Sequence, residues 1–321
     1  MNSYDMLRNV SRTFALSIEQ LPGLQREAVT VAYLLFRVAD CIEDHDMLDA
    51  RTKARLLRLW AGILTGEAPV DALTAELARL DGSDPEVYVA QQADSVMAHL
   101  MSIPENHRSI LARHVRETSL GMARWQDHGP FVRDEAEMDD YMHEVAGRVG
   151  WLLTEVFALH SPAIAAQKNR LMELGREFGL ALQTVNIIRG MRKDFERGWI
   201  FVPETFCGHA GLDSVQLFDP AHEAAALEVL GMLTAKARRH LDNGIAYIRL
   251  LPRRLRSVRL FCIWPLLFAA RTLAISEKNP DVLRAEAKIT RAEVQRIVSI
   301  SGMFCWSNAL LTAYYKSLLK K

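Results

Sequence analysis

The chain has 321 residues, of which 50% are hydrophobic and 24% are charged, and its formal net charge is zero. This composition is typical of a globular protein with ample material for a core, and the length allows one large domain or two of ordinary size. The balanced charge argues against nucleic acid or another strongly anionic partner.

Apolar residues recur at helical spacing along nearly the whole sequence, whereas the strict alternation typical of strands is absent. Short breaks rich in Gly, Pro, Asp and Ser separate the helical segments, and neither a linker nor an internal repeat divides the chain. We therefore predict a single all-α domain over residues 1–321. In chain order, the predicted helices are 29–42, 55–64, 87–101, 107–125, 138–159, 168–195, 220–251, 257–276 and 291–319.

Targeting and redox signals favour a cytoplasmic protein. The N-terminal sequence MNSYDMLRNV contains an acid and lacks the apolar stretch of a signal peptide. The longest apolar run, LFCIWPLLFAA from Leu260, has about half the length of a membrane span and contains a proline, so we predict a core helix and no transmembrane segment. The cysteines form no CxxC pair or zinc-type cluster and are expected to be buried thiols; they are Cys41, Cys207, Cys262 and Cys305.

The first long helix carries the clearest chemical signal, a pair of carboxylates in YLLFRVADCIEDH. Asp40 and Asp44 lie one turn apart on one helix face, and Arg37 is on the same side. Carboxylates in an otherwise apolar helix are costly to bury unless a cation compensates them. Mg²⁺ is commonly shared between one or two carboxylates and substrate phosphates. From the residues alone, a Mg²⁺ site and a helix end whose acids simply face water are both open.

Six segments in order make the sequence resemble the squalene/phytoene synthase family, whose members join prenyl diphosphates head to head. The resemblance covers nearly the whole chain. The sequences GMA, VAGRVG, NIIR and FCIWP are closer to those of squalene synthases than to those of phytoene synthases. The six segments are SRTFALSI, AYLLFRVADCIED, GMARW, YMHEVAGRVG, LQTVNIIRGMRKDFERGWIFVP and SVRLFCIWPLLFAARTLA.

The resemblance implies an isoprenoid-synthase bundle of helices around a deep central cavity, with two Asp-rich motifs that hold Mg²⁺ at its mouth. It implies a transferase of isoprenoid biosynthesis that condenses two farnesyl diphosphates, or similar prenyl diphosphates, through presqualene diphosphate to squalene or a related C30 product. The metal and cationic side chains stabilise the departing diphosphate, and a dry pocket protects the carbocation.

The resemblance also assigns roles to residues. The expected metal ligands are Asp40, Asp44, Asn186 and Asp194. The expected diphosphate-binding residues are Ser11, Arg12, Gln183, Asn186, Arg189 and Arg197, and the expected catalytic residues are Tyr33, Arg37 and Tyr141. The residues alone offer plainer interpretations for three of these, namely a helix N-cap at Ser11 and buried tyrosines with satisfied hydroxyls at Tyr33 and Tyr141.

The second Asp-rich motif departs from the family pattern, because Gly190 stands where an aspartate is usual. The surrounding helix is basic, which shifts the segment from cation binding toward direct anion binding. Three outcomes are open: Mg²⁺ bound with fewer protein ligands, catalysis of only part of the reaction, or a non-catalytic homologue that binds a prenyl lipid or a partner protein. A family member that transfers one prenyl group to a different acceptor is a further alternative.

Two basic segments and a glycine pair complete the predictions. Lys288 and Arg291 in AKITRAEV resemble the region where reductive squalene synthases bind the NADPH phosphate, and surface charge at a helix start is the alternative. Gly147 and Gly150 are expected to allow close approach of a helix or of the substrate. The arginines of PRRLRSVR are open to two interpretations, a solvated basic face and peripheral contact with phospholipid headgroups or a partner; they are Arg253, Arg254, Arg256 and Arg259.

Overall fold

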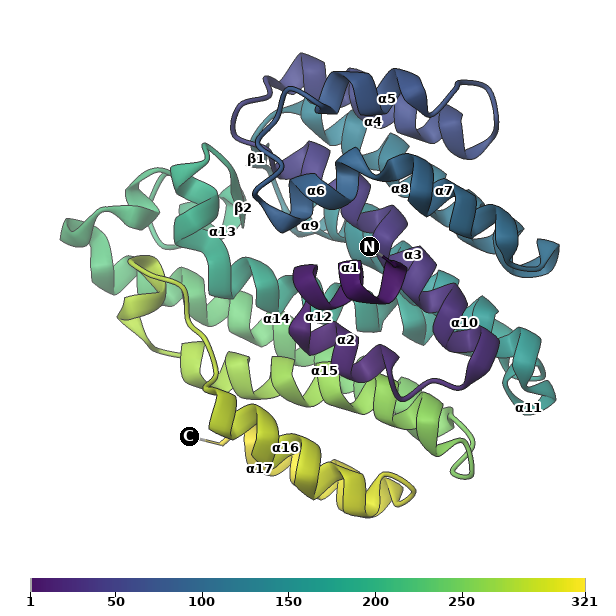
Figure 1. Cartoon of the computed structure of the whole chain (residues 1–321). Coiled ribbons are helices and arrows are strands. Elements are labelled where there is room, and N and C mark those ends of the chain that lie inside the picture. The colour runs from purple at the N-terminus through teal and green to yellow at the C-terminus, as the bar shows by residue number, and fades with distance from the viewer. Residues whose placement is uncertain (1, 321) are drawn as a thin grey trace. The chain divides into compact units, whose positions relative to one another are not determined.

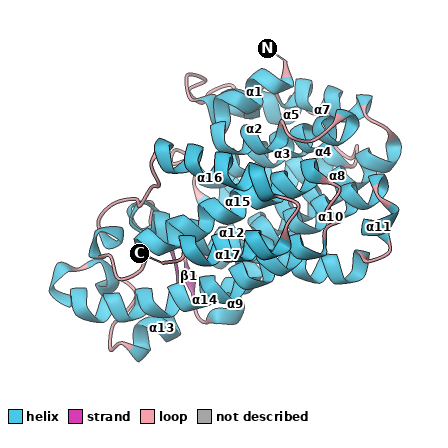
Figure 2. Ribbon diagram, turned by 90° about the horizontal axis from the view of Figure 1, so that it is seen from below, coloured by secondary structure: helices cyan, strands magenta, loops and turns pink. Residues whose placement is uncertain are grey.

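The computed structural model describes residues 2–320, with the side chain of Arg12 excepted. Helices make up almost all of the regular structure, and the only strands within the described residues are one short parallel pair (Figure 2). The predicted all-α fold class is therefore confirmed. The chain divides into two compact units, residues 1–129 with 151–166 and residues 130–150 with 167–321. That residues 1–321 form a single domain around a deep cavity stays a prediction.

The first unit is built around helix α3 (Gly23–Asp44), which has neighbouring helices on several sides. More than half of the side chains of α3 are buried, and the indole of Trp60 donates a hydrogen bond to the Leu35 carbonyl at 3.3 Å. The nearly continuous apolar sequence of this helix thus places it in the core. The other helices are α1 (Ser3–Val10), α2 (Arg12–Ile18), α4 (Ala50–Leu64), α5 (Asp71–Leu77), α6 (Pro85–Gln91), α7 (Ala93–Ser102), α8 (Glu105–His128), most of α10 (Arg148–His160) and α11 (Pro162–Ala165).

The second unit is built on two long helices packed against each other, α12 (Lys168–Glu196) and α14 (Glu223–Leu250). Helix α15 (Arg256–Ser276) packs on both, and α16 and α17 lie beside it (Figure 1). The remaining elements are β1 (Phe131–Val132), α9 (Glu135–Met142), the π-helical turn η1 (His143–Gly147), β2 (Ile200–Pro203), α13 (Glu204–His209), the 3-10 turns η2 (Gln216–Phe218), η3 (Pro220–His222) and η4 (Pro280–Leu283), α16 (Arg291–Phe304) and α17 (Asn308–Leu318).

Helix α15 contains the long apolar run of the sequence. Within the described residues it alone is long and apolar enough to cross a membrane by length and composition, but 78% of its most apolar stretch is buried inside the protein. Leu266 and Leu267 have no exposed surface at all. The predicted core helix is confirmed, and the four cysteines are buried free thiols as expected.

Glycines let the start of α10 approach α12 at backbone distance. A Cβ atom added at Gly150 would lie 1.9 Å from the Gly175 carbonyl oxygen, and one added at Gly179 would lie 2.2 Å from the Ala146 carbonyl oxygen. Contacts this short are impossible for any side chain, so the sequence must keep glycine where the two backbones touch. The prediction that Gly150 permits close approach of a helix is confirmed.

Replacing Gly150 by alanine is expected to destabilise the protein by about 1–3 kcal/mol or more, because the new methyl group meets backbone that cannot rotate away. The matched control is Gly190→Ala in α12, where the nearest atom to a new Cβ is the Asp194 carboxylate oxygen at 3.8 Å. That change is expected to be neutral or to stabilise the helix by about 0.5–1 kcal/mol. Urea unfolding of both variants measures the difference, and equal midpoints would contradict the packing argument.

Arg259 is a buried cation that holds three helix ends together. It has no exposed surface, and its guanidinium donates to the carbonyl oxygens of Cys305 at 2.6 Å, Ile248 at 2.7 Å and Leu251 at 2.9 Å. A fourth hydrogen bond of 2.7 Å reaches the side chain of Asn308. Burial lowers the pKa of Arg259, and the partial negative charge of helix C-termini compensates the guanidinium. For Arg259, both a solvated basic face and a headgroup contact are therefore wrong.

Candidate functional site

The predicted acidic pair lies in the last turn of α3. Asp40 is half-buried, with 34% of its side chain exposed, and Asp44 is exposed. The last turn of α3 contains no basic residue, so both carboxylates lie at the negative end of the helix dipole without a local counter-charge from that turn. This position disfavours the two negative charges and favours a bound cation.

Arg37, one turn before Asp40, connects the acidic pair to a second helix. Its guanidinium donates to the Tyr33 hydroxyl at 2.7 Å, pairs with Glu86 of α6 at 3.0 Å and lies 3.7 Å from the Asp40 carboxylate. Burial by itself lowers the pKa of Arg37, but the charges of Asp40, Tyr33 and Glu86 outweigh it and raise the pKa above its usual range. Arg37 is therefore a fixed cation whose side chain is oriented from two directions.

The charge around Asp40 is unbalanced toward the negative. Burial raises the pKa of Asp40 to about 6, and the charges of Asp44 and Glu86 add to this shift while Arg37 opposes it. Two carboxylates, Asp40 and Glu86, thus lie beside the Arg37 guanidinium, and the charge of Asp44 also acts on Asp40. Bringing a divalent cation to this end of α3 would relieve the excess negative charge.

The donor set suits a metal that is shared with a ligand. Among the described residues, no three His, Cys, Asp or Glu side chains form a group that could hold a metal by themselves. Two carboxylates on one helix face are, however, the usual protein share of a Mg²⁺ ion whose other ligands are water and phosphate oxygens. Asp40 and Asp44 therefore fit Mg²⁺ that is bound together with a diphosphate.

The second motif, at the C-terminal end of α12, contains one carboxylate and it is already paired. Asp194 forms an ion pair with Arg197 at 2.7 Å, and both side chains are largely buried. Asn186 is exposed and donates to the Gln183 amide oxygen at 3.4 Å. Position 190 has open space next to Asp194. Asp40 and Asp44 belong to the first unit and Asp194 and Asn186 to the second, so their action as one metal site stays a prediction.

A basic cluster lies beside this motif within the second unit. Arg189 of α12 pairs with Glu286 at 3.0 Å, and Lys288 pairs with the same carboxylate at 2.5 Å. The structure thus brings the predicted cofactor-binding Lys288 next to the predicted diphosphate-binding Arg189. Arg291 is exposed at the first position of α16, where Thr290 caps the helix. The role of Arg291 stays a prediction.

The contacts of two further predicted residues, Ser11 and Tyr141, are those of a helix cap and of a packed aromatic side chain. The Ser11 hydroxyl accepts a hydrogen bond from the Phe14 amide at 3.2 Å and caps α2, and the side chain of Arg12 lies outside the described part of the chain. Tyr141 is buried and stacks on Phe201 of β2, with ring centroids 4.3 Å apart. Their functional roles stay predictions.

Glu86 is the site residue that sequence reasoning missed. It lies in the first turn of α6, after the Asp84 N-cap and Pro85, and these residues do signal the start of a helix. Nothing in the sequence, however, indicates that this turn meets Arg37, because the two residues are 49 positions apart.

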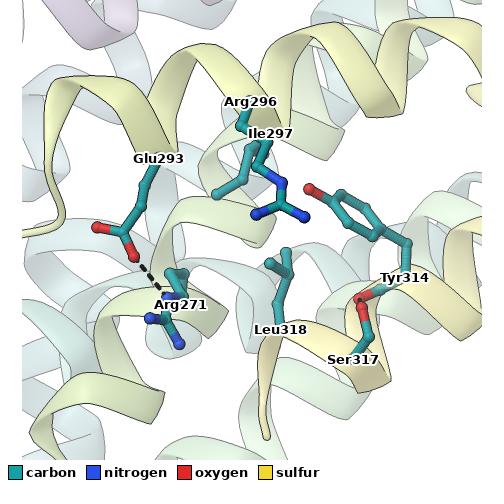
Figure 3. Close-up of a pocket in the computed structure, with 7 residues that line it drawn as sticks. All are labelled: Arg271, Glu293, Arg296, Ile297, Tyr314, Ser317 and Leu318. Carbon is teal, nitrogen blue, oxygen red and sulfur yellow. Dashed lines mark hydrogen bonds and ion pairs between the residues drawn. The ribbon is translucent and has the colours of Figure 1, made fainter. Parts of the chain in front are cut away.

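A separate pocket of about 290 Å³ lies among α15, α16 and α17 (Figure 3). Inside it, Arg271 donates a 2.8 Å hydrogen bond to Glu293. None of the residues predicted for diphosphate or metal lines this pocket, so it adds nothing to the candidate site. Its lining residues are Arg271, Glu293, Arg296, Ile297, Tyr314, Ser317 and Leu318.

Comparisons with known proteins place the chain in a known family. A model of the family described as Squalene/phytoene synthase matches residues 7–293. The squalene synthase of Schizosaccharomyces pombe is 30% identical over 303 residues, which are 92% of this chain and 63% of that protein. The squalene synthase of Homo sapiens is 27% identical over 293 residues, which are 90% of this chain and 66% of that protein. The chain therefore spans less than two thirds of the length of these curated relatives.

Solved structures agree with the sequence comparison. A TcSQS–ligand complex is 27% identical and aligns with a TM-score of 0.85 over 99% of this chain and 90% of that chain. A dehydrosqualene synthase–ligand complex, at 16% identity, aligns with a TM-score of 0.61 over 98% of this chain and 95% of that chain, which shows a common fold. With the family match over most of its length, the chain belongs to the squalene/phytoene synthase family.

Proposed function

We propose that the protein is a prenyltransferase that joins two farnesyl diphosphates, or similar prenyl diphosphates, head to head in a Mg²⁺-dependent reaction. The product would be squalene or a related C30 hydrocarbon, formed through presqualene diphosphate. The single observation that carries the proposal is the half-buried Asp40 beside Asp44, Glu86 and Arg37 in a chain of this family. A cation bound there would offset the carboxylate charge, and a prenyl diphosphate would bring the remaining oxygen ligands.

In this mechanism, bound Mg²⁺ would neutralise charge on the leaving diphosphate. Asp40 and Asp44 hold the metal, and Arg37 keeps a positive charge near it because Glu86 and Tyr33 fix its side chain. Arg189 and Arg197 supply further positive charge for diphosphate in the second unit, after they exchange their internal carboxylate partners. Each of these groups acts on charge that develops at the leaving group, where preorganised charge is most effective.

Reduction of the condensed product is the finer part of the proposal. Lys288 and Arg291 are the residues assigned to the phosphate of NADPH. Lys288 shares Glu286 with Arg189, so a phosphate near Lys288 would also lie near a diphosphate-binding residue. Partial catalysis that stops at the first condensation needs neither Lys288 nor Arg291.

One observation favours a second candidate, a homologue that binds prenyl diphosphate without turning it over. The second motif offers one carboxylate, and Arg197 already neutralises it.

The test is incubation with farnesyl or geranylgeranyl diphosphate and Mg²⁺, with and without NADPH, followed by lipid extraction and mass spectrometry. Consumption of the donor with a C30 or C40 product supports the synthase, and a product with one prenyl group on another acceptor identifies the alternative transferase. Thermal stabilisation by farnesyl diphosphate without consumption identifies the binder.

Restoring the missing acid by Gly190→Asp is expected to lower the Mg²⁺ concentration for half-maximal pyrophosphate release about tenfold, because affinity for a hard cation rises with the number of carboxylate ligands. The helix has room for the side chain, since the nearest atom to a new Cβ is 3.8 Å away. Gly190→Asn is the matched control, with the same shape and no charge. Unchanged or weaker Mg²⁺ dependence in Gly190→Asp would mean that the native site does not lack this ligand.

A further inference from the structure

Large apolar side chains are exposed around the turn between α16 and α17. Met303 in the last turn of α16 is 71% exposed, Trp306 in the connecting turn is 53% exposed, and Leu310 in the first turn of α17 is 51% exposed. Single exposed apolar residues are common, but a local group of this kind marks an interaction surface. These three residues are called the apolar turn.

A basic loop is held against the apolar turn. Arg253 and Arg254 lie in the connection between α14 and α15, and Arg256 begins α15; all three are exposed. The Arg256 guanidinium donates to the Gly302 carbonyl at 3.3 Å, and the Asn308 amide donates to the Arg249 carbonyl at 3.0 Å.

Arg259 of α15 also connects to the turn between α16 and α17, through its hydrogen bond to the Cys305 carbonyl. The basic loop is defined as Arg253, Arg254 and Arg256. Hydrogen bonds from Arg256 to Gly302, from Asn308 to Arg249 and from Arg259 to Cys305 place this loop beside the segment that carries the apolar turn. These contacts all lie within the second unit.

The positive charge of the basic loop is not balanced locally. Residues 243–276 contain six arginines and no acid, and residues 294–320 contain three basic residues and no acid, although the whole chain has zero net charge. In the described part of the chain neither Arg253 nor Arg254 forms an ion pair.

The acids that flank these two ranges have other partners. Asp242 accepts a hydrogen bond from Tyr315 at 3.0 Å, and Glu277 pairs with Arg238 at 2.6 Å. Glu293 pairs with Arg271 at 2.8 Å. Arg253 and Arg254 thus present exposed positive charge that no acid of the described residues pairs.

We propose that the apolar turn and the basic loop together dock the protein on the surface of an anionic phospholipid membrane. A tryptophan beside flexible apolar side chains suits the boundary between headgroups and acyl chains, and neighbouring arginines suit the headgroup phosphates. Both features occur here on one edge, and residues 243–276 and 294–320 add no acid to it. The contact is peripheral, because α15 is buried within the protein. This inference goes beyond the proposed reaction and does not depend on it.

The test is flotation of the full chain with vesicles of phosphatidylcholine alone and of phosphatidylcholine mixed with phosphatidylglycerol. The protein is expected to bind the mixed vesicles and to be released by added salt, because the attraction is screened. Arg253→Gln with Arg254→Gln is expected to weaken binding about 25-fold, since each basic residue near the surface contributes about fivefold. The matched control removes two exposed arginines elsewhere, Arg51→Gln with Arg170→Gln, and should bind as the native chain does.

The apolar part is tested with Met303→Ser and Trp306→Ser combined, which is expected to abolish binding even with both arginines present. Met47→Ser with Val215→Ser removes two comparably exposed apolar side chains elsewhere and should bind normally. Circular dichroism and thermal unfolding verify that all variants fold. Equal binding of the native chain to neutral and mixed vesicles, or equal weakening by test and control pairs, would overturn the proposal. So would self-association through Trp306 without vesicle binding.

Discussion

Replacement of Asp40 and Asp44 together by asparagine is expected to lower Mg²⁺-dependent pyrophosphate release from farnesyl diphosphate by about a thousandfold or more. Asparagine keeps the shape of both side chains and removes both charges, so the main change is loss of cation binding, and the 3.7 Å ion pair between Asp40 and Arg37 is lost as well. Loss of even one preorganised group at a developing charge commonly costs a hundredfold to a thousandfold. Release is measured by a coupled pyrophosphate assay over a range of Mg²⁺ concentrations.

The same variant should fold as well as the native chain. Because burial raises the pKa of Asp40 to about 6, its charge is less stable in the folded protein than in the unfolded chain, and removing that charge does not remove a stabilising group. The melting temperature should therefore stay constant or rise. Asp46→Asn, an exposed acid just beyond α3, is the matched control and should retain native release. Native release from the double variant would show that these carboxylates do not bind the metal.

Replacement of Arg259 by methionine is expected to destabilise the protein by about 3–5 kcal/mol. Methionine fills much of the space, but it leaves the carbonyl oxygens of Ile248, Leu251 and Cys305 without their donor inside the protein. Each buried acceptor left unsatisfied costs about 1–3 kcal/mol. Calorimetry should show a melting temperature lower by roughly 10 °C, at the few degrees per kcal/mol typical of a chain of this size.

Two further substitutions separate hydrogen bonding from charge. Arg256→Met removes an exposed arginine that makes one hydrogen bond, and it should change stability by about 0.5 kcal/mol or less. Arg259→Lys keeps the charge, but a single ammonium cannot reach acceptors on both sides as the planar guanidinium does. Most of the loss of stability expected for Arg259→Met should therefore remain. Similar stability of the two methionine variants would refute the role assigned to Arg259.

The long helices could be predicted from the sequence because each one spans several apolar periods. The predicted helix 87–101 is two helices in the structure, since the chain breaks at Gln92, and the predicted helix 291–319 breaks at residues 305–307. In both cases apolar spacing continues across the break, so periodicity alone cannot reveal it. The five helices without a counterpart among the predictions have four to eight residues, too few for a recognisable period; they are α1, α2, α5, α11 and α13.

The candidate site was predictable where its residues are neighbours on one helix. Asp40 and Asp44 are four residues apart, and their common face follows from helix geometry. The ion pair between Arg37 and Glu86 depends on how α6 packs against α3, and no local sequence pattern predicts that packing. Arg259 shows the same limit, because its sequence neighbours are exposed arginines while its own position lies where the ends of α14 and α16 converge.

The ion pair between Asp194 and Arg197 has a consequence for the order of events at the second motif. If Asp194 is a metal ligand, it must first leave Arg197, and an incoming diphosphate is the natural replacement partner for that guanidinium. Bound diphosphate would then raise the affinity for Mg²⁺, and bound Mg²⁺ would raise the affinity for diphosphate by the same factor, as thermodynamic reciprocity requires. Calorimetric titration of Mg²⁺ with and without pyrophosphate would reveal this mutual dependence once the heat of Mg²⁺ binding to pyrophosphate in protein-free buffer is subtracted, and identical corrected isotherms would exclude it. Without ligands, the ion pair would thus keep Asp194 from binding metal ions, and the second motif would open only when Mg²⁺ and diphosphate bind together.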